Sequence, residues 1–117
     1  MGDMSVILEG VDSQWAGQSL RSTVHGAGRV MGRMEAKGKW KNGVCVRPGK
    51  VTAEMMDEWV NKEGVELRGA GLDEAPQCYK RLPDVLAEHV GTVRILHRLT
   101  PLGVAMAGAN EFDPYRD

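Results

Sequence analysis

Apolar and polar residues change their spacing several times along the chain, and these changes predict alternating strands and helices. The apolar run from Met4 to Leu8 predicts a strand, whereas the polar stretch Val11 to Gly17 predicts a turn. Residues 41–46 indicate a turn and a strand before the breaker Pro48-Gly49, and residues 65–68 a further strand. Near the end of the chain, apolar residues alternate with more polar ones, which predicts a strand with one buried face. Its alternating positions are Val93, Ile95, His97 and Leu99.

Helices are predicted where capping residues and breakers flank suitable stretches. The first helix opens after Gly28 and runs to about Lys37, where Gly38 stops it. Thr52 caps a second helix over Ala53 to about Lys62, and Gly64 ends it.

A third helix begins with Pro83 in its first turn and is closed by Gly91. The second helix carries Met55, Met56 and Trp59 at a spacing that suits one buried stripe.

The elements together predict an α+β fold, with helices packed on a small mixed or antiparallel sheet. A chain of 117 residues fits one domain, which we place at residues 1–117. Buried positions are expected at Met56, Trp59, Leu86, Ile95 and Leu99.

Composition narrows the class of protein. Aromatic residues make up only 5%, so aliphatic side chains and seven methionines must fill the core. No stretch of about 20 apolar residues is present, and the first residues lack the basic and apolar regions of a signal peptide. Cys45 and Cys78 lie far apart without a CxxC pattern, which favours reduced thiols. We therefore expect a cytoplasmic protein without a membrane partner.

Charge is unevenly distributed although the net charge is only −1. Residues 21–50 hold eight Lys or Arg against Glu35 alone, whereas the segments before and after are acidic. Arg29 and Arg33 lie four apart, and they would share one face of the predicted first helix. A positive segment of this kind suits a triphosphate or an RNA backbone, although solvated basic side chains are the simpler interpretation of Lys37, Lys39 and Lys41.

The basic segment contains the run His25-Gly26-Ala27-Gly28-Arg29, which places an imidazole against a glycine turn that ends in a guanidinium. Two glycines let backbone amides approach a ligand, and an arginine can meet a phosphate with two charged hydrogen bonds. His25 would face that phosphate as nucleophile, acid or base. A glycine turn that initiates a helix beside an incidental histidine remains an equal interpretation of this run alone. A dinucleotide-binding loop is disfavoured, because the spacing from Gly28 to the next glycine is one residue too long.

The other histidines do not extend this site. His25, His89 and His97 lack the close spacing of a metal pair. His89 falls in the last turn of a predicted helix, where a cation suits the helix dipole. His97 lies in the alternating strand, where a satisfied core or edge histidine is favoured over a ligand.

Two further motifs connect His25 to a known family. Asp73-Glu74-Ala75-Pro76-Gln77-Cys78-Tyr79-Lys80 is followed by Leu96-His97-Arg98-Leu99-Thr100-Pro101-Leu102-Gly103-Val104. With the start Met1-Gly2-Asp3-Met4-Ser5 and the HGAGR run, the sequence resembles the C-terminal portion of the RtcB-type RNA-splicing ligases, in family order and over essentially the whole chain. The resemblance implies GTP- and manganese-dependent joining of an RNA 3′-phosphate, or 2′,3′-cyclic phosphate, to a 5′-hydroxyl.

The resemblance also implies a role for individual residues. His25 matches the histidine that accepts the guanylyl group, and Tyr79 matches the ring that stacks on guanine. Ser5 matches a serine that contacts the nucleotide, and Glu74 an acidic residue that positions it. The phosphates would be held by Gly26, Ala27, Gly28, Arg29 and Arg33. From the residues alone, a half-buried aromatic beside Pro76 is the simpler interpretation of Tyr79.

The sequence also departs from the family pattern. The cysteine, aspartate and histidines that bind manganese in the family lie upstream of HGAGR and have no counterpart among these residues. The family's guanine-recognising lysine is also without a match, because no lysine follows Lys80. Gly32 replaces a usual serine, and residues 109–117 extend beyond the family's end.

Three hypotheses follow from the resemblance. The chain is the C-terminal portion of an RNA ligase, or a noncatalytic module that binds nucleotide or RNA, or an assembly subunit. The enzyme activity of the chain by itself stays open, and we expect it to be inactive alone. Its expected partners are RNA, a guanine nucleotide and the missing N-terminal part. We also expect a homo-oligomer, since loss of the rest of a compact enzyme exposes apolar surface.

Overall fold

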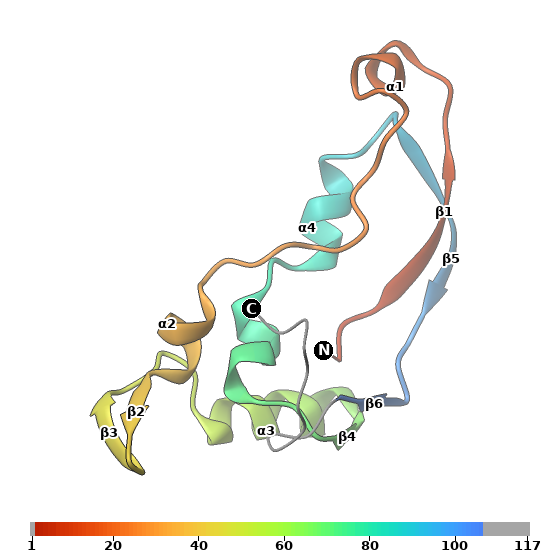
Figure 1. Cartoon of the computed structure of the whole chain (residues 1–117). Coiled ribbons are helices and arrows are strands. Elements are labelled where there is room, and N and C mark those ends of the chain that lie inside the picture. The colour runs from red at the N-terminus through yellow and green to blue at the C-terminus, as the bar shows by residue number, and fades with distance from the viewer. Residues whose placement is uncertain (1, 107–117) are drawn as a thin grey trace. The chain divides into compact units, whose positions relative to one another are not determined.

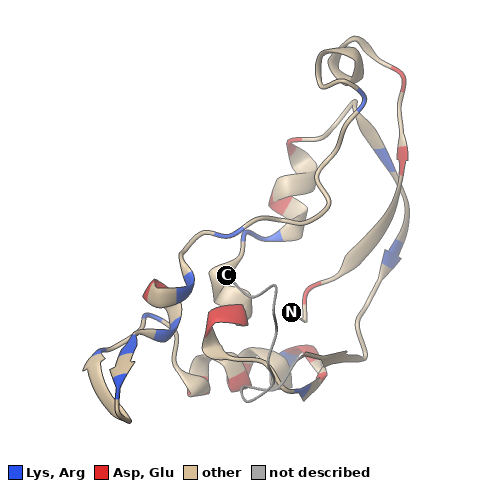
Figure 2. Ribbon diagram, in the orientation of Figure 1, with Lys and Arg blue, Asp and Glu red and all other residues tan. Residues whose placement is uncertain are grey.

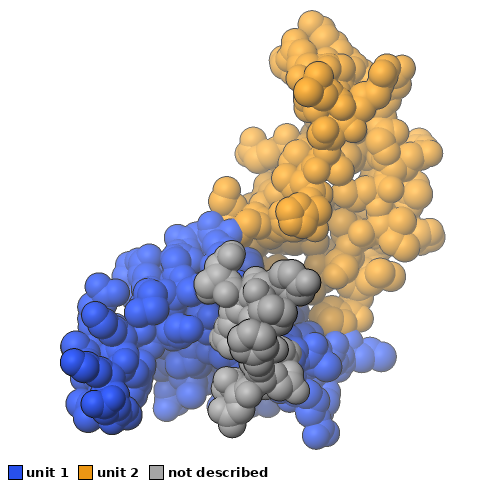
Figure 3. Space-filling view, in the orientation of Figure 1, with its two compact units in different colours: residues 1–2, 29–79, 102–117 blue, residues 3–28, 80–101 orange. Residues whose placement is uncertain are grey.

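The computed structural model describes residues 2–106, which form two compact units. Of these residues, unit 1 comprises 2, 29–79 and 102–106, and unit 2 comprises 3–28 and 80–101 (Figure 3). Met1 and the predicted tail extension at 109–117 lie outside the described residues. Helices accompany antiparallel and parallel strand pairs, so the predicted α+β class is confirmed (Figure 1). The extent of one domain over the whole chain stays a prediction.

Unit 2 is built on an antiparallel pair of strands. Strand β1 (Ser5–Gly10) pairs with β5 (Val93–Leu99), in a register that places Ser5 opposite Leu99 and Gly10 opposite Val93. Both strands were predicted. Helix α4 (Leu82–Ala87) has a proline in its first turn as predicted, and it ends before the predicted stop at Gly91.

Helix α1 (Gln14–Gln18) of unit 2 lies where the sequence predicts a turn from Val11 to Gly17. That prediction is wrong for its second half. The Ser13 hydroxyl accepts a hydrogen bond from the Ala16 amide, and Ala16 is buried. A side-chain cap and one buried residue are enough to set a single short turn of helix, and neither produces an apolar periodicity.

Unit 1 contains the best-predicted helix, α3 (Ala53–Glu63). The Thr52 hydroxyl accepts from the Met55 amide at 3.3 Å, and Gly64 adopts the left-handed conformation that ends the helix. Two strand pairs belong to the same unit. They are the antiparallel hairpin of β2 (Lys39–Lys41) and β3 (Val44–Arg47), and the parallel pair of β4 (Glu66–Arg68) and β6 (Gly103–Ala105).

Helix α2 (Arg33–Lys37) is shorter than the sequence predicts. It begins at Arg33 instead of directly after Gly28, because the backbone of Arg29 and Val30 is bound to residues far away in the sequence. Arg29 forms an isolated antiparallel bridge with Tyr79, and the Val30 amide donates to the Cys78 carbonyl at 2.8 Å. A long-range backbone pairing thus replaces the predicted first turn. The expected helix N-terminus beside His25 is therefore wrong, and so is the shared helix face of Arg29 and Arg33.

The core of unit 1 consists of small side chains. Ala36, Val51, Ala75 and Cys78 are buried together, and the part-buried side chains packed against them are Met31, Met56, Leu72 and Tyr79. Of the five positions predicted to be buried, Leu86 is buried, whereas Met56, Trp59 and Ile95 are only partly so.

Leu99 is 49% exposed, so its predicted burial is wrong. Residues 96–99 of β5 are exposed on both faces, because within unit 2 this end of the strand pairs only with β1. His97 is likewise exposed, opposite Ile7, and this excludes a core histidine but not one at a sheet edge. No helix in residues 2–106 is long and apolar enough to span a membrane.

Two glycines join the hairpin to α2 by close backbone contact. A Cβ on Gly49 would lie 2.1 Å from the Ala36 carbonyl oxygen, and one on Gly38 would lie 2.4 Å from the Arg47 carbonyl oxygen. Gly38 also has a φ of +78°, which other residues rarely adopt. The Val51 amide donates to the Ala36 carbonyl at 3.0 Å in the same region.

We expect Gly49→Ala to lower the free energy of unfolding by about 2–3 kcal/mol, since the added methyl meets backbone that cannot move aside. The matched control is Gly32→Ala, where a Cβ meets nothing within 4 Å, and its cost should stay below about 1 kcal/mol. Urea denaturation followed by circular dichroism measures both. Equal stabilities for the two variants would contradict the close packing of α2 on the hairpin base.

Candidate functional site

The turn Asp73-Glu74-Ala75-Pro76 lies in two consecutive 3₁₀ turns. These are η1 (Leu72–Glu74) and η2 (Pro76–Cys78), joined at Ala75, which is fully buried. Asp73 is 1% exposed, so the turn carries a carboxylate into the interior of unit 1. A buried charge must be paired to be tolerated, and the basic segment supplies its partners.

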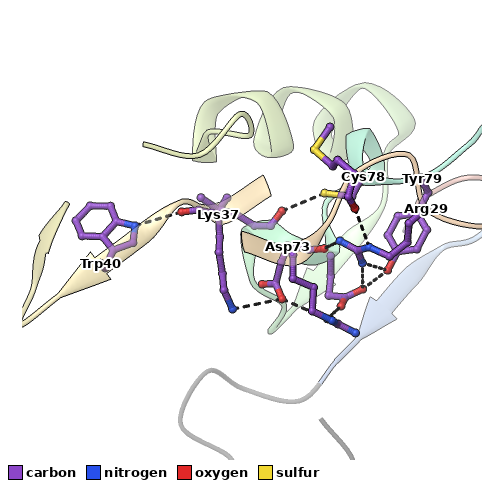
Figure 4. Close-up of polar contacts among 10 residues, drawn as sticks. Arg29, Lys37, Trp40, Asp73, Cys78 and Tyr79 are labelled. Atoms are coloured by element: carbon purple, nitrogen blue, oxygen red, sulfur yellow. Dashed lines mark hydrogen bonds and ion pairs between the residues drawn. The ribbon is translucent and has the colours of Figure 1, made fainter. Parts of the chain in front are cut away.

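Arg29 spans this turn with all three of its guanidinium nitrogens. Nη1 donates to the Tyr79 hydroxyl at 2.7 Å, Nη2 to the Asp73 carbonyl at 2.5 Å, and Nε to the Met31 carbonyl at 3.1 Å (Figure 4). The guanidinium carbon also lies 4.7 Å from the centre of the Tyr79 ring. Glu74 is the nearest carboxylate, with its Oε2 atom 3.6 Å from Nη1.

Two cations of α2 complete the cluster. Arg33 Nη1 contacts Asp73 Oδ2 at 3.2 Å and donates a second hydrogen bond to Glu74 Oε1. Lys37, one helical turn later, places its Nζ atom 3.6 Å from the same Asp73 oxygen. The Tyr79 hydroxyl donates to the other carboxylate oxygen of Glu74. Three cations therefore face two carboxylates, and we call these six residues the Asp73–Glu74 cluster.

The cluster changes the acidity of its members. The hydrogen bond to Asp73 is the main cause that raises the pKa of Arg33 above its ordinary value, and the charge of Glu74 adds to it. Burial raises the pKa of the Tyr79 phenol, and the hydrogen bond to Glu74 raises it further. Burial also raises the pKa of the Cys78 thiol beneath the cluster. Arg33 therefore stays charged, and Tyr79 and Cys78 stay neutral, at physiological pH.

Four of the nine predicted site residues meet in this cluster. They are Arg29 and Arg33 from one segment and Glu74 and Tyr79 from another, 41 to 50 positions later in the sequence. One prediction about them needs refinement. The Tyr79 ring, expected to offer a flat face to guanine, already has the Arg29 guanidinium over it.

The other five predicted residues belong to unit 2. Ser5 is exposed at the start of β1, and His25 is exposed before the glycine turn. Within that turn, a Cβ on Gly26 or on Gly28 would meet nothing within 4 Å, and Gly28 has a φ of +82°. Ala27 lies between them, and the Gly28 carbonyl accepts from the Lys80 amide at 2.9 Å. The turn thus needs Gly28 for its backbone conformation, and both glycines leave room for a ligand.

Sequence reasoning missed two members of the cluster, Asp73 and Lys37. Asp73 belongs to the same motif as Glu74. It was missed because the sequence does not show that this carboxylate is buried. Lys37 follows Arg33 by four residues, a spacing that places both side chains on one face of α2. That spacing could have identified Lys37, but the prediction applied it to Arg29 and Arg33.

The described residues contain no group of three or more His, Cys, Asp or Glu that could hold a metal ion. The two carboxylates of the cluster, Asp73 and Glu74, are already paired with arginine and lysine. The cluster therefore does not fit a manganese ion. It does fit an anion better than a cation, because its positive charges exceed its negative ones.

Comparison with known proteins decides the family. The family model described as "tRNA-splicing ligase RtcB" matches residues 1–107. The chain belongs to the RtcB family. A "tRNA-splicing ligase RtcB" of Archaeoglobus fulgidus is 36% identical over 111 residues, and one of Pyrococcus furiosus is 30% identical over 111 residues. An "RNA-splicing ligase RtcB" of Mycobacterium bovis is 35% identical over 105 residues.

The alignments cover most of this chain but only a small share of each relative. It covers 90% of this chain for the two archaeal relatives and 88% for the mycobacterial one. The same alignments cover only 20%, 10% and 22% of those RtcB proteins. The chain therefore corresponds to a small part of an RtcB ligase, as the resemblance predicted.

Tyr79→Phe should change how stability depends on pH. Because the pKa of Tyr79 is raised on folding, its contribution to stability is fully present below the ordinary tyrosine pKa of about 10 and is lost as the pH rises through the higher folded value. At pH 8 the variant should be less stable by about 1–2 kcal/mol, since it loses the bonds to Arg29 and Glu74. Between pH 9 and pH 11.5 the unmodified chain should lose more stability than the variant.

Urea denaturation at each pH measures this difference. Two parallel stability profiles would show that the Tyr79 phenol is not held neutral by the cluster, and would contradict the geometry above.

Proposed function

We propose that this chain supplies the guanylyl-accepting part of an RtcB-type RNA ligase, with His25 as the acceptor. Membership of the RtcB family supports an RNA ligase activity for the whole protein of which such a chain forms part. The observation that carries the proposal is the contact of Arg29, from the HGAGR run, with Tyr79 and Asp73 of the second motif. Two sequence motifs that the resemblance assigns to one nucleotide site are thus joined at Arg29.

His25 would act as a nucleophile. A neutral imidazole nitrogen attacks the α-phosphorus of GTP, the bond to the bridging oxygen breaks, and pyrophosphate leaves. The new bond joins nitrogen to phosphorus, and the imidazole loses its remaining proton to solvent. The exposed position of His25 and the open glycine turn that follows it suit such an attack.

The residues that the resemblance assigns to the nucleotide would bind and orient it. Gly26, Ala27 and Gly28 would bring backbone amides to the phosphates, and Arg29 and Arg33 would add positive charge. Arg29 and Arg33 are engaged by carboxylates and carbonyls in this structure, so a triphosphate would have to share or displace those contacts. Ser5 and Tyr79 would contact the nucleoside, and Glu74 would position Tyr79 through their hydrogen bond.

The family's divalent cation would neutralise the triphosphate. The ligands that the resemblance assigns to manganese lie upstream of the residues of this sequence, and the Asp73–Glu74 cluster offers no substitute. We therefore infer that the chain by itself does not form the guanylyl adduct, and that the cytoplasmic ligase needs the N-terminal part as a partner.

Exposed apolar side chains support such a partner. Leu20 and Leu102 are both 86% exposed and Val90 is 80% exposed. Contact with the N-terminal part or with a second copy of the chain would bury them. We propose that the isolated chain forms a homo-oligomer in which side chains of this kind are buried.

Intact mass spectrometry after incubation with GTP and manganese tests the role of His25. The chain alone should gain no mass. A chimera that joins it to the upstream portion of the Archaeoglobus fulgidus relative should gain one guanylyl group, since that portion supplies the missing ligands.

His25→Ala should abolish the adduct in the chimera, whereas His97→Ala, an exposed histidine on β5, should leave it. An adduct that survives His25→Ala would refute His25 as the acceptor. An adduct on the isolated chain that disappears in His25→Ala would refute the need for the N-terminal part, but it would support His25 as the acceptor.

A further inference from the structure

The hairpin of β2 and β3 exposes positive charge together with an aromatic ring. We call residues 39–47 the basic ribbon. Every residue of it is exposed, and Trp40 has 61% of its surface accessible. Figure 2 shows Lys and Arg positions along β2 and at the end of β3, with no acidic position between them. The resemblance assigns no role to these residues.

The register of the hairpin brings like charges together. Lys39 pairs with Arg47, and Lys41 pairs with Val44, with a shift of register between Lys39 and Trp40. Lys39 and Lys41 share one face because they are two positions apart in a strand, and Trp40 falls on the other face opposite Cys45. Like charges directly opposite each other destabilise a strand pair. This arrangement therefore does not serve the stability of the hairpin.

Nearby carboxylates do not neutralise the ribbon. Within residues 2–106, no carboxylate lies at ion-pair distance from Lys39, Lys41 or Arg47. The adjacent carboxylate, Glu35, pairs with Lys50 at 2.6 Å, and this contact is the main cause that lowers the pKa of Glu35, whereas the charge of Arg47 is the smallest cause named. The ribbon thus presents three cations to solvent.

The ribbon is fixed at its base. The Lys50 amide donates to the Glu35 carbonyl at 2.9 Å, and Gly38 and Gly49 allow the backbone of α2 and of the ribbon base to touch. The indole nitrogen of Trp40 donates to the Lys37 carbonyl at 3.2 Å, which orients the ring (Figure 4). A ring that is already oriented loses little freedom when a flat ligand stacks on it.

We propose that the basic ribbon binds single-stranded RNA, with Lys39, Lys41 and Arg47 on backbone phosphates and Trp40 stacked on an unpaired base. RNA as the polyanion rests on the proposed function, whereas the surface rests on the charge and register of the hairpin. A single strand crossing the edge of a two-stranded ribbon reaches both of its faces. A duplex does not, because its bases are already stacked and unavailable to Trp40.

Fluorescence anisotropy with a labelled single-stranded oligoribonucleotide bearing a 3′-phosphate tests this surface. The titrations use the whole chain, without GTP or metal, at 50 to 200 mM KCl. The ribbon variant Lys39→Gln/Lys41→Gln/Arg47→Gln should bind at least roughly tenfold more weakly at 50 mM KCl. Its slope of log K against log salt should fall by about 2, as expected for three lost phosphate contacts on a single strand.

Trp40→Ala should weaken binding roughly tenfold without changing the salt slope, because it removes stacking and no charge. The matched control Lys62→Gln/Arg68→Gln/Arg98→Gln removes three exposed cations elsewhere and should change affinity less than threefold. Circular dichroism checks that every variant keeps the fold.

Several outcomes would overturn the proposal. These are no RNA binding by the unmodified chain at 50 mM KCl, equal losses in the ribbon and control variants, or tighter binding of a duplex of the same sequence. Capture of a protein by the ribbon without RNA binding would also overturn it. The ribbon variant, placed in the chimera described above, should still gain one guanylyl group, so failure of RNA binding by the ribbon and failure of the guanylylation proposal are distinguished.

Discussion

The need to pair a buried carboxylate organises unit 1. Asp73 is almost inaccessible to water, and an unpaired charge at such a position would cost far more than a folded chain of this size can tolerate. Arg33 and Lys37 approach its carboxylate, and Arg29 holds its carbonyl. Arg29 must be extended to reach this turn, so α2 begins only at Arg33. The hairpin in turn starts where α2 ends.

The elements that the sequence predicted well are those determined by near neighbours. Thr52 and Gly64 cap α3 through contacts within one turn, and a reader of the sequence can see both. The predicted start of α2 was wrong because Tyr79 and Cys78, which bind the backbone of Arg29 and Val30, are some 50 positions away. Strand β6 was not predicted for the same reason, since a three-residue parallel pairing with β4 leaves no local pattern.

In the candidate site too, the sequence identified residues but not the long-range contacts between them. Motif resemblance selected Arg29, Arg33, Glu74 and Tyr79, and all four meet in the Asp73–Glu74 cluster. The contacts themselves could not be predicted. The arginines expected to be available for phosphate are engaged by carboxylates, and the tyrosine expected to be open carries a guanidinium on its ring. Burial of Asp73 causes this difference, and burial is a property of the fold as a whole. Nucleotide binding at these residues would therefore exchange one set of ionic contacts for another.

The central physical claim is that Arg33 and Glu74 stabilise the fold through each other, in addition to the contacts that each makes with Asp73 or Tyr79. A double-mutant cycle of Arg33→Gln and Glu74→Gln, measured by urea denaturation at pH 7, tests it most directly. The geometry predicts a favourable coupling of about 1–3 kcal/mol, with the double variant more stable than the sum of the single losses implies. Strictly additive losses would contradict the account.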